Sequence, residues 1–137
     1  MYSIGELSRR TGVKVPTIRY YESIGLIASC GRSAGNQRRF DRQGIDRLAF
    51  IRHARALGFP LDAIRALLDL SDDPETPCAE ADRIAAEQLA DTRARIARLE
   101  RLAAELERIA TGCASDRAGG CNVLQALADH RHCAGPH

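Results

Sequence analysis

The sequence predicts a mainly α-helical fold, in which four short helices and a two-stranded hairpin precede one long helix and a cysteine-containing loop. Helix-capping signals and helically spaced apolar residues fill the first half of the chain. A heptad-like apolar pattern runs through much of the second half, and cysteines flank it. The 137 residues are 45% hydrophobic and 28% charged, which suits one compact core and an extended element.

The first two helices are predicted from their end signals. Ser3 and Glu6 have the spacing of a capping box, which begins a helix over residues 4–11. Pro16 suits the first position of a second helix, and Gly25 suits its left-handed end. Two short helices joined by a tight turn form a helix-turn-helix.

A two-stranded wing and two further helices are expected next. Leu26 and Ile27 are predicted to form one strand and residues 38–40 the other, with a Gly-, Ser- and Asn-containing turn between them. Asp41 can cap a third helix, which ends near residues 58–60, and a fourth helix follows. The positions expected to face the core of these two helices are Ile45, Leu48, Ile51, Leu61, Ile64, Leu67 and Leu68.

One long helix is predicted over residues 79–111, with a length of roughly 50 Å. Its apolar positions alternate by four and three residues, as heptad a and d sites do, and only Thr92 among them is polar. Such a seam needs a partner helix. The residues after Gly112 are few and rich in Gly, Pro and His, so we expect pairing between two chains in a symmetric dimer rather than an intrachain hairpin. The seam consists of Ala85, Leu89, Thr92, Ile96, Leu99, Ala103, Leu106 and Ala110.

Charge is unevenly divided along the chain. Residues 1–60 carry a formal charge of +7 and the remainder −5, so we expect only the first half to bind a polyanion such as DNA. No grouping of side chains suggests a catalytic site, so an enzyme is not expected. No apolar run has the length of a membrane span and the start lacks a signal-peptide core, which together favour a soluble, cytoplasmic protein.

Three segments carry the pattern of a known family: Thr17-Ile18-Arg19-Tyr20-Tyr21-Glu22, Gly25-Leu26-Ile27 and Asn36-Gln37-Arg38-Arg39-Phe40. Together they resemble the MerR family of bacterial transcription regulators. The resemblance implies a winged helix-turn-helix DNA-binding domain, a long antiparallel coiled-coil dimerisation helix and a C-terminal metal-binding loop. The expected divisions are residues 1–70 for the DNA-binding domain, 71–78 for a linker, 79–111 for the dimerisation helix, 112–128 for the metal-binding loop and a short helix, and 129–137 for a flexible tail.

The resemblance also implies which residues contact promoter DNA. The second helix would enter the major groove, while the wing would contact the flanking backbone. We expect Tyr21 to pack beneath the second helix and not to touch DNA. The implied DNA-binding residues are Lys14, Thr17, Arg19, Tyr20, Arg38, Arg39 and Phe40.

Cysteine placement points to thiolate chemistry. Five cysteines and no secretion signal argue against a disulfide framework. Cys78 precedes the long helix, whereas Cys113 and Cys121 follow it, so one chain cannot bring all three to one ion. An antiparallel dimer would place Cys78 of one subunit beside Cys113 and Cys121 of the other. Cys30, in the wing, is interpreted as a bystander.

The identity of the metal rests on the ligand count. By resemblance, sensors of zinc, cadmium, lead or mercury have a cysteine at the head of the long helix, as Cys78 is here, whereas monovalent copper sensors have a serine. Three thiolates leave a net charge of −1 with a divalent ion, so a divalent thiophilic metal is favoured. The seven residues between Cys113 and Cys121 match the loop length of copper and gold sensors, which keeps monovalent copper as an alternative.

The remaining ligand candidates are open. Zinc or cadmium would seek a fourth ligand, for which Asp116, a tail histidine and water are candidates. The tail is expected either to form an accessory site or to be disordered. Its candidate ligands are His130, His132, Cys133 and His137.

The resemblance implies a regulator that occupies a promoter with an overlong spacer and, on binding metal, untwists and bends the DNA so that RNA polymerase holoenzyme can engage it. Metal resistance or efflux genes would be activated. Two alternatives remain: a thiol-based redox or electrophile sensor that uses the same DNA-binding half, and a metal storage or delivery protein.

Overall fold

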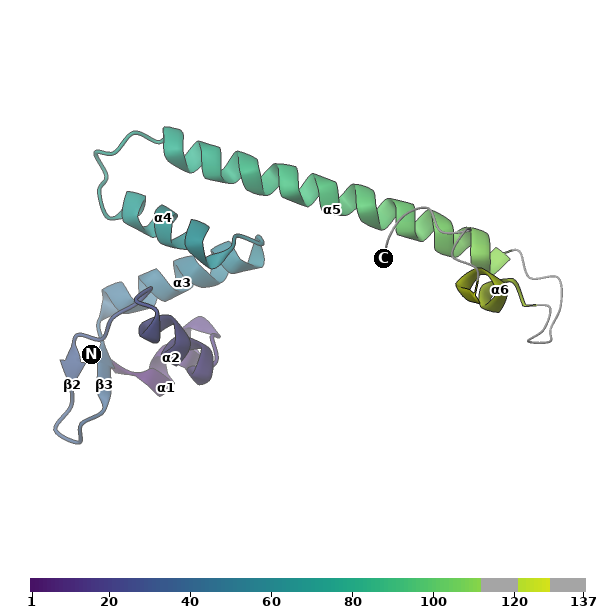
Figure 1. Cartoon of the computed structure of the whole chain (residues 1–137). Helices are drawn as coiled ribbons and strands as arrows, with labels where there is room; N and C mark the ends of the chain where they lie inside the picture. The colour runs from purple at the N-terminus through teal and green to yellow at the C-terminus, as the bar shows by residue number, and fades with distance from the viewer. Residues whose placement is uncertain (112–120, 129–137) are drawn as a thin grey trace. The chain divides into compact units, whose positions relative to one another are not determined.

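The computed structural model describes residues 1–111 and 121–128 and confirms a mainly helical fold (Figure 1). Contacts divide the chain into two compact units, residues 1–85 and 86–137, and each is described by itself. Among the described residues, no helix combines the length and apolar character needed to cross a membrane.

The helix-turn-helix is formed by α1 (Ile4–Thr11) and α2 (Val15–Ser23). Ser3 caps α1 as predicted, because its hydroxyl accepts a hydrogen bond from the backbone N–H of Glu6 at 3.2 Å. Gly12 ends α1 with φ of 76°, a conformation that a residue with a side chain rarely adopts. The α2 helix begins one residue earlier than predicted, with Lys14 at its N-cap.

The wing belongs to a three-stranded sheet of β1 (Tyr2–Ser3), β2 (Gly31–Arg32) and β3 (Arg38–Phe40). The strands are ordered β1-β3-β2, and both pairs are antiparallel. The prediction of a strand at Leu26 and Ile27 is wrong. Both side chains are almost fully buried, so their apolar character reflects packing into the core after α2 rather than strand pairing.

The core of the first unit lies between the helix-turn-helix, β3 and two longer helices, α3 (Arg42–Ala56) and α4 (Leu61–Ser71). Asp41 caps α3 as predicted, accepting a hydrogen bond from the Gly44 N–H at 3.0 Å. Of the predicted core positions, Leu48, Ile51, Ile64 and Leu68 are buried, while Ile45 and Leu61 are partly buried against them. The cluster also includes Leu7, Ile18, Tyr21, Leu26, Ile27 and Phe40.

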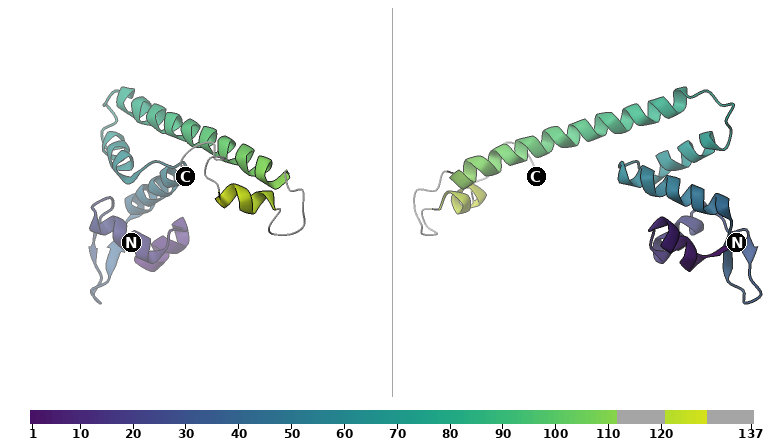
Figure 2. Two further views of the ribbon diagram at one scale, coloured as in Figure 1. Left: turned by 45° about the vertical axis from the view of Figure 1, so that its right-hand side comes forward. Right: turned by 180° about the vertical axis from the view of Figure 1, so that it is seen from behind.

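The long helix α5 (Ala79–Thr111) has the predicted bounds. A short helix, α6 (Asn122–Ala128), lies alongside its C-terminal end (Figure 2). The Asn122 side-chain amide donates hydrogen bonds to the carbonyls of Arg108 and Ile109, at 3.3 and 2.8 Å, which satisfies two acceptors in the last turn of α5. Ile109 and Ala126 are buried there, at 7% and 5% exposure.

The apolar seam of α5 is solvent-exposed in the single chain. Leu89 and Ile96 are about half exposed, at 49% and 50%, and Leu99 and Leu106 are each 64% exposed. The short helix α6 covers a different face, the one that carries Ile109. Among the described residues, therefore, no intrachain helix buries the seam.

Candidate nucleic-acid interface and metal-ligand residues

The α2 helix presents cationic and aromatic side chains from its start to its last turn. Lys14, Arg19 and Tyr20 are exposed, Tyr20 at 52%, and Thr17 is partly buried. Tyr21 is 8% exposed and belongs to the core, as predicted. Because Ile18 and Tyr21 anchor the opposite face, the exposed residues are held on a helix that is rigidly packed.

The wing is attached to α2 by an ion pair. The Arg38 Nε lies 2.6 Å from Glu22 Oε1, and this joins β3 to the last turn of α2. The Arg38 side chain keeps 39% exposure. Sequence reasoning missed Glu22 as the residue that fixes the wing against the helix, although an acid in α2 and a basic strand were both visible.

Phe40 requires a correction. It was predicted to contact DNA, but its side chain has no exposed surface. Side chains alternate along β3, with Phe40 turned into the core and the preceding arginine partly exposed. Phe40 is therefore removed from the DNA-binding set and supports the wing from beneath.

Several arginines of the first unit donate hydrogen bonds to backbone carbonyls of their own fold. Arg52 Nη1 donates to the Thr11 carbonyl at 2.7 Å and Arg55 Nη1 to the Phe59 carbonyl at 2.9 Å. Arg65, from α4, donates to the Ile24 carbonyl. Cationic donors at helix ends satisfy carbonyls and complement the helix dipole. Two cations of residues 1–60, Arg52 and Arg55, are thus held against the protein's own backbone, although their guanidinium groups keep their charge.

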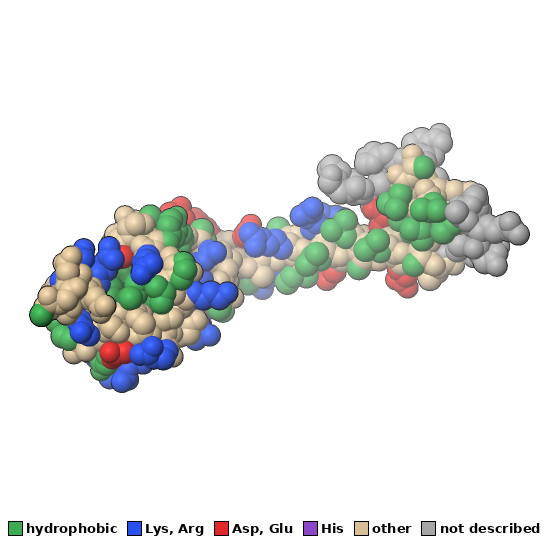
Figure 3. Space-filling view, turned by 90° about the horizontal axis from the view of Figure 1, so that it is seen from below, with side chains coloured by type: hydrophobic (Ala, Val, Ile, Leu, Met, Phe, Trp, Pro, Cys, Tyr) green, Lys and Arg blue, Asp and Glu red, His purple; other side chains and the backbone are tan. Residues whose placement is uncertain are grey.

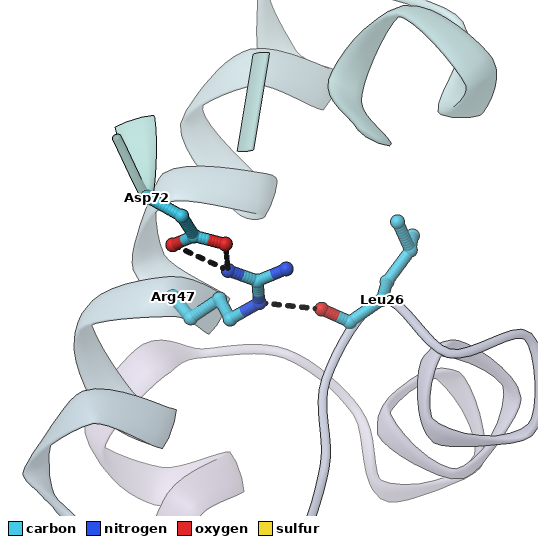
Figure 4. Close-up of polar contacts among 3 residues, drawn as sticks. All are labelled: Leu26, Arg47 and Asp72. Atoms are coloured by element: carbon cyan, nitrogen blue, oxygen red, sulfur yellow. Dashed lines mark hydrogen bonds and ion pairs between the residues drawn. The ribbon is translucent and has the colours of Figure 1, made fainter. Parts of the chain in front are cut away.

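Arg47 makes the most extensive of these internal contacts. Its Nε donates to the Leu26 carbonyl at 2.7 Å, and its Nη1 lies 3.1 and 3.2 Å from the two carboxylate oxygens of Asp72 (Figure 4). Leu26 follows α2 and Asp72 follows α4, so one guanidinium connects the start of the wing segment to the end of α4. Arg47 is therefore part of the packing of the first unit and is not simply solvated surface.

The cations that remain are on the outside of the first unit, where Lys and Arg side chains are spread over the face seen in Figure 3. Within residues 1–111 and 121–128, Lys14, Arg19 and Arg39 make no ion pair. Arg32, which the sequence analysis did not select, is exposed in the wing and donates to the Asn36 carbonyl at 3.2 Å.

Cys30 is an exposed free thiol beside β3. A hydrogen bond with the Asp41 carboxylate raises the pKa of the Cys30 thiol, and the same bond, with the Gly44 N–H, lowers the pKa of Asp41. The thiolate is the nucleophile and metal ligand, so this environment disfavours both chemistries at Cys30.

The three predicted metal ligands are distributed over both ends of α5. Cys78 is an exposed free thiol directly before the helix, and its Sγ lies 3.9 Å from Asp82 Oδ1. Cys121 is a partly buried free thiol directly before α6. Cys113 lies outside the described residues, as do Asp116 and the tail residues His130, His132, Cys133 and His137.

Within the described residues, no group of three or more His, Cys, Asp or Glu side chains could hold an ion. Cys78 precedes α5 and Cys121 follows it in the sequence, and α5 itself is about 50 Å long at 1.5 Å per residue. Asp82, one helical turn after Cys78, was not selected from the sequence, although its i+4 spacing places it on the same helix face.

Two family models match the chain and together span most of it. The model described as MerR HTH family regulatory protein matches residues 2–71, and the model described as MerR, DNA binding matches residues 45–109. Both describe DNA-binding regulators, which agrees with the expectation that the chain is not an enzyme.

Individual relatives cover nearly the whole chain. It is 40% identical over 130 residues to the HTH-type transcriptional regulator ZntR of Escherichia coli K12, covering 93% of this chain and 92% of that protein. The lead(II) complex of the regulator PbrR691 from Ralstonia metallidurans has a TM-score of 0.80 at 38% identity, covering 93% and 99% of the two chains. The mercury(II) complex of MerR from Bacillus megaterium has a TM-score of 0.69 at 30% identity, covering 93% and 100%.

Proposed function

The chain belongs to the MerR family of helix-turn-helix transcription regulators, and from this premise we propose that it activates transcription in response to a divalent thiophilic metal. The observation that carries the proposal is the placement of free thiols at both ends of a helix whose apolar seam is exposed. Relatives whose structures contain lead(II) or mercury(II) support the class of metal.

The proposed DNA contacts are exposed and partly exposed side chains of α2 and the wing. Lys14, Thr17, Arg19 and Tyr20 would contact the major groove and its phosphates, and Arg38 and Arg39 the flanking backbone. The Arg38–Glu22 ion pair supports this arrangement, because it fixes the angle between wing and helix before DNA is bound.

The proposed metal site joins two subunits. Cys113 and Cys121 of one chain and Cys78 of its partner would supply three thiolates, and Asp82 next to Cys78 offers a carboxylate for ions that prefer four ligands. The donor set fits such an ion, since Cys78 and Cys121 are free thiols without a disulfide. When bound, the metal would order the ends of the coil and bias the two DNA-binding units between two arrangements.

We further propose that the dimer acts in the cytoplasm on promoter DNA with RNA polymerase holoenzyme. Distorting the DNA costs a few kcal/mol, which a difference in metal affinity between the two arrangements can offset.

Metal titration of the reduced dimer tests the proposal. Zinc, cadmium, lead, mercury and monovalent copper are added separately, and thiolate-to-metal absorption and stoichiometry are followed. We expect one divalent ion per subunit with three sulfurs each. Binding of monovalent copper alone, through two sulfurs, would show instead that the loop length identifies the metal.

Two serine variants localise the site. Cys78→Ser is expected to abolish the divalent response in a promoter transcription assay and to leave DNA binding intact. Cys30→Ser is the matched control, because the Cys30 thiol lies in the wing, is hydrogen-bonded to the Asp41 carboxylate and is not in the proposed ligand set. Unchanged induction of the Cys78→Ser variant would remove Cys78 from the ligand set, and oxidant-driven induction without metal would favour a redox sensor.

A further inference from the structure

A hollow of about 410 Å³ lies between the last turn of α1 and one face of α3, apart from the side chains assigned to DNA above. Its α3 residues are spaced by three and four positions, so they share one face of that helix. The two helices pack against each other, which fixes the two sides of the hollow relative to one another. The hollow is lined by Arg10, Thr11, Ala49, Arg52, His53 and Ala56.

The lining of this hollow is cationic. Arg10 and Arg52 carry positive charges, His53 adds an imidazole, and none of the described residues that line the hollow is acidic. By comparison, the hollow beside Arg47 is also lined by Asp41 and Asp72. Because no carboxylate in the lining balances the two guanidinium groups, the hollow between α1 and α3 favours an anion.

Arg52 is held in place from one side of its guanidinium. Its Nη1 donates to the Thr11 carbonyl at 2.7 Å, and it packs so closely on the turn that a Cβ at Gly12 would lie 2.8 Å from Nη1. The bond also offsets the partial negative charge at the C-terminal end of α1, which would otherwise repel an anion. Within residues 1–111 and 121–128, the Nε and Nη2 groups of Arg52 donate no hydrogen bond, so they remain for a ligand.

Arg10 is positioned by a contact that leaves its charge unbalanced. Its Cζ lies 4.7 Å from the centroid of the Tyr2 ring, a cation–π contact. In the described part of the chain, Arg10 makes no ion pair. Two cations already held in position lose less side-chain entropy on binding an anion than two freely moving ones.

The form of the hollow suits a polyanion chain. Apart from Thr11, its lining residues are exposed, so the hollow is open to solvent. An enclosed small-molecule site would bury most of its ligand. Ala49 and Ala56 are small, and they leave the surface of α3 on both sides of Arg52 and His53 accessible to an extended chain.

The hollow lies close to the start of α2. Thr11 precedes Lys14, the N-cap of α2, by three residues, so their Cα atoms are at most about 11 Å apart. The intervening turn is fixed, because the Ser8 hydroxyl donates to the Val13 carbonyl at 2.6 Å. A DNA strand presents a phosphate about every 3.4 Å of helix axis. A strand that is contacted at Lys14 therefore has further phosphates within the range of the hollow.

We propose that the hollow between α1 and α3 binds a backbone phosphate of the operator through Arg10 and Arg52, with His53 as a further donor. The inference rests on the DNA binding proposed above and adds one phosphate contact per subunit to those of α2 and the wing. Because this contact is to the backbone, it contributes affinity for DNA of every sequence and no base preference.

Two adjacent arginines test the proposal. Arg10→Gln removes a charge from the hollow, whereas Arg9→Gln removes the same charge from an exposed side chain that does not line it. Arg10→Gln should weaken promoter binding about tenfold and reduce the slope of log binding constant against log salt concentration by about 2 per dimer. Arg9→Gln should leave the slope unchanged. Arg10→Lys should restore it, because an ammonium group also binds phosphate.

Ethylation interference identifies the phosphate directly. The wild type and Arg9→Gln should share one sensitive phosphate in each half-site that Arg10→Gln lacks, and thermal unfolding by circular dichroism verifies that the three proteins are equally folded. Equal salt slopes for Arg9→Gln and Arg10→Gln, or one interference pattern for all three proteins, would overturn the phosphate site. A wild-type protein that does not bind promoter DNA would instead refute the proposed function, which separates the two failures.

Discussion

Removing the Arg47 side chain tests whether this arginine stabilises the first unit mainly through the Leu26 carbonyl or through Asp72. The Arg47 side chain is 23% exposed and its bond to Leu26 is 2.7 Å, so we assign that bond the ~1.5–3 kcal/mol of a charged donor. The Asp72 carboxylate is 54% exposed, which limits the ion pair to about 0.2–1 kcal/mol. Arg47→Ala should therefore lower the free energy of unfolding by about 2–4 kcal/mol, and Asp72→Ala by less than about 1 kcal/mol.

Urea unfolding at one fixed protein concentration measures both variants and their double mutant, because dimerisation makes stability depend on concentration. Arg42→Ala is the matched control. Its ion pair with Asp46 is highly exposed on both sides, at 78% and 69%, so its loss should cost less than about 0.5 kcal/mol. If Asp72→Ala costs as much as Arg47→Ala, the reasoning from exposure is refuted and the ion pair dominates.

Three other substitutions give separate tests. Arg19→Ala should weaken binding to every DNA sequence and reduce the slope of log binding constant against log salt concentration by about 2 per dimer. Arg55→Ala should leave this slope unchanged, because the Arg55 guanidinium donates a hydrogen bond to a backbone carbonyl. Equal slopes for the two variants would show that Arg19 makes no phosphate contact. Asp41→Asn keeps a helix cap but removes the carboxylate that raises the pKa of the Cys30 thiol. The alkylation rate of Cys30, followed by mass spectrometry, should therefore rise at a lower pH than in the wild type. An unchanged pH profile would contradict the effect of Asp41 on the Cys30 pKa. Phe40→Ala should lower the free energy of unfolding in urea by about 3–5 kcal/mol, because Phe40 is fully buried. Phe40→Leu should keep the DNA affinity of the wild type. A loss of affinity in the Leu variant at unchanged stability would show that Phe40 does contact DNA.

Local signals determined the elements whose ends are marked by capping or helix-breaking residues. The Ser3 cap, the glycine after α1 and the proline near the start of α2 act through bonds and dihedral angles within a few residues, so their positions could be predicted accurately. The heptad pattern likewise gave α5 its bounds, since a long periodic segment has few alternative structures.

The residues of the candidate site could likewise be predicted from the sequence only in part. Residue type and order identified the cysteines at the ends of α5 and the cationic side chains of α2. Metal coordination needs a thiolate and phosphate contact needs a cation, and the residue types in the sequence show both. Sequence order alone could not reveal which cations are free to act, since an arginine has the same letter whether it faces solvent or a carbonyl.

Tertiary structure decided the matters that depend on long-range contacts. Arg47 and Arg52 bond carbonyls 21 and 41 residues earlier in the chain, and no local pattern encodes such a distance. Phe40 at 0% exposure and the β1–β3 pairing depend on where the first residues of the chain return to the sheet. The sequence by itself therefore determined the order of helices, the exposed seam and the thiols, through spacing and side-chain chemistry. Only the fold decided which basic and aromatic side chains support the core and which remain on the surface, because burial is a property of the packed chain.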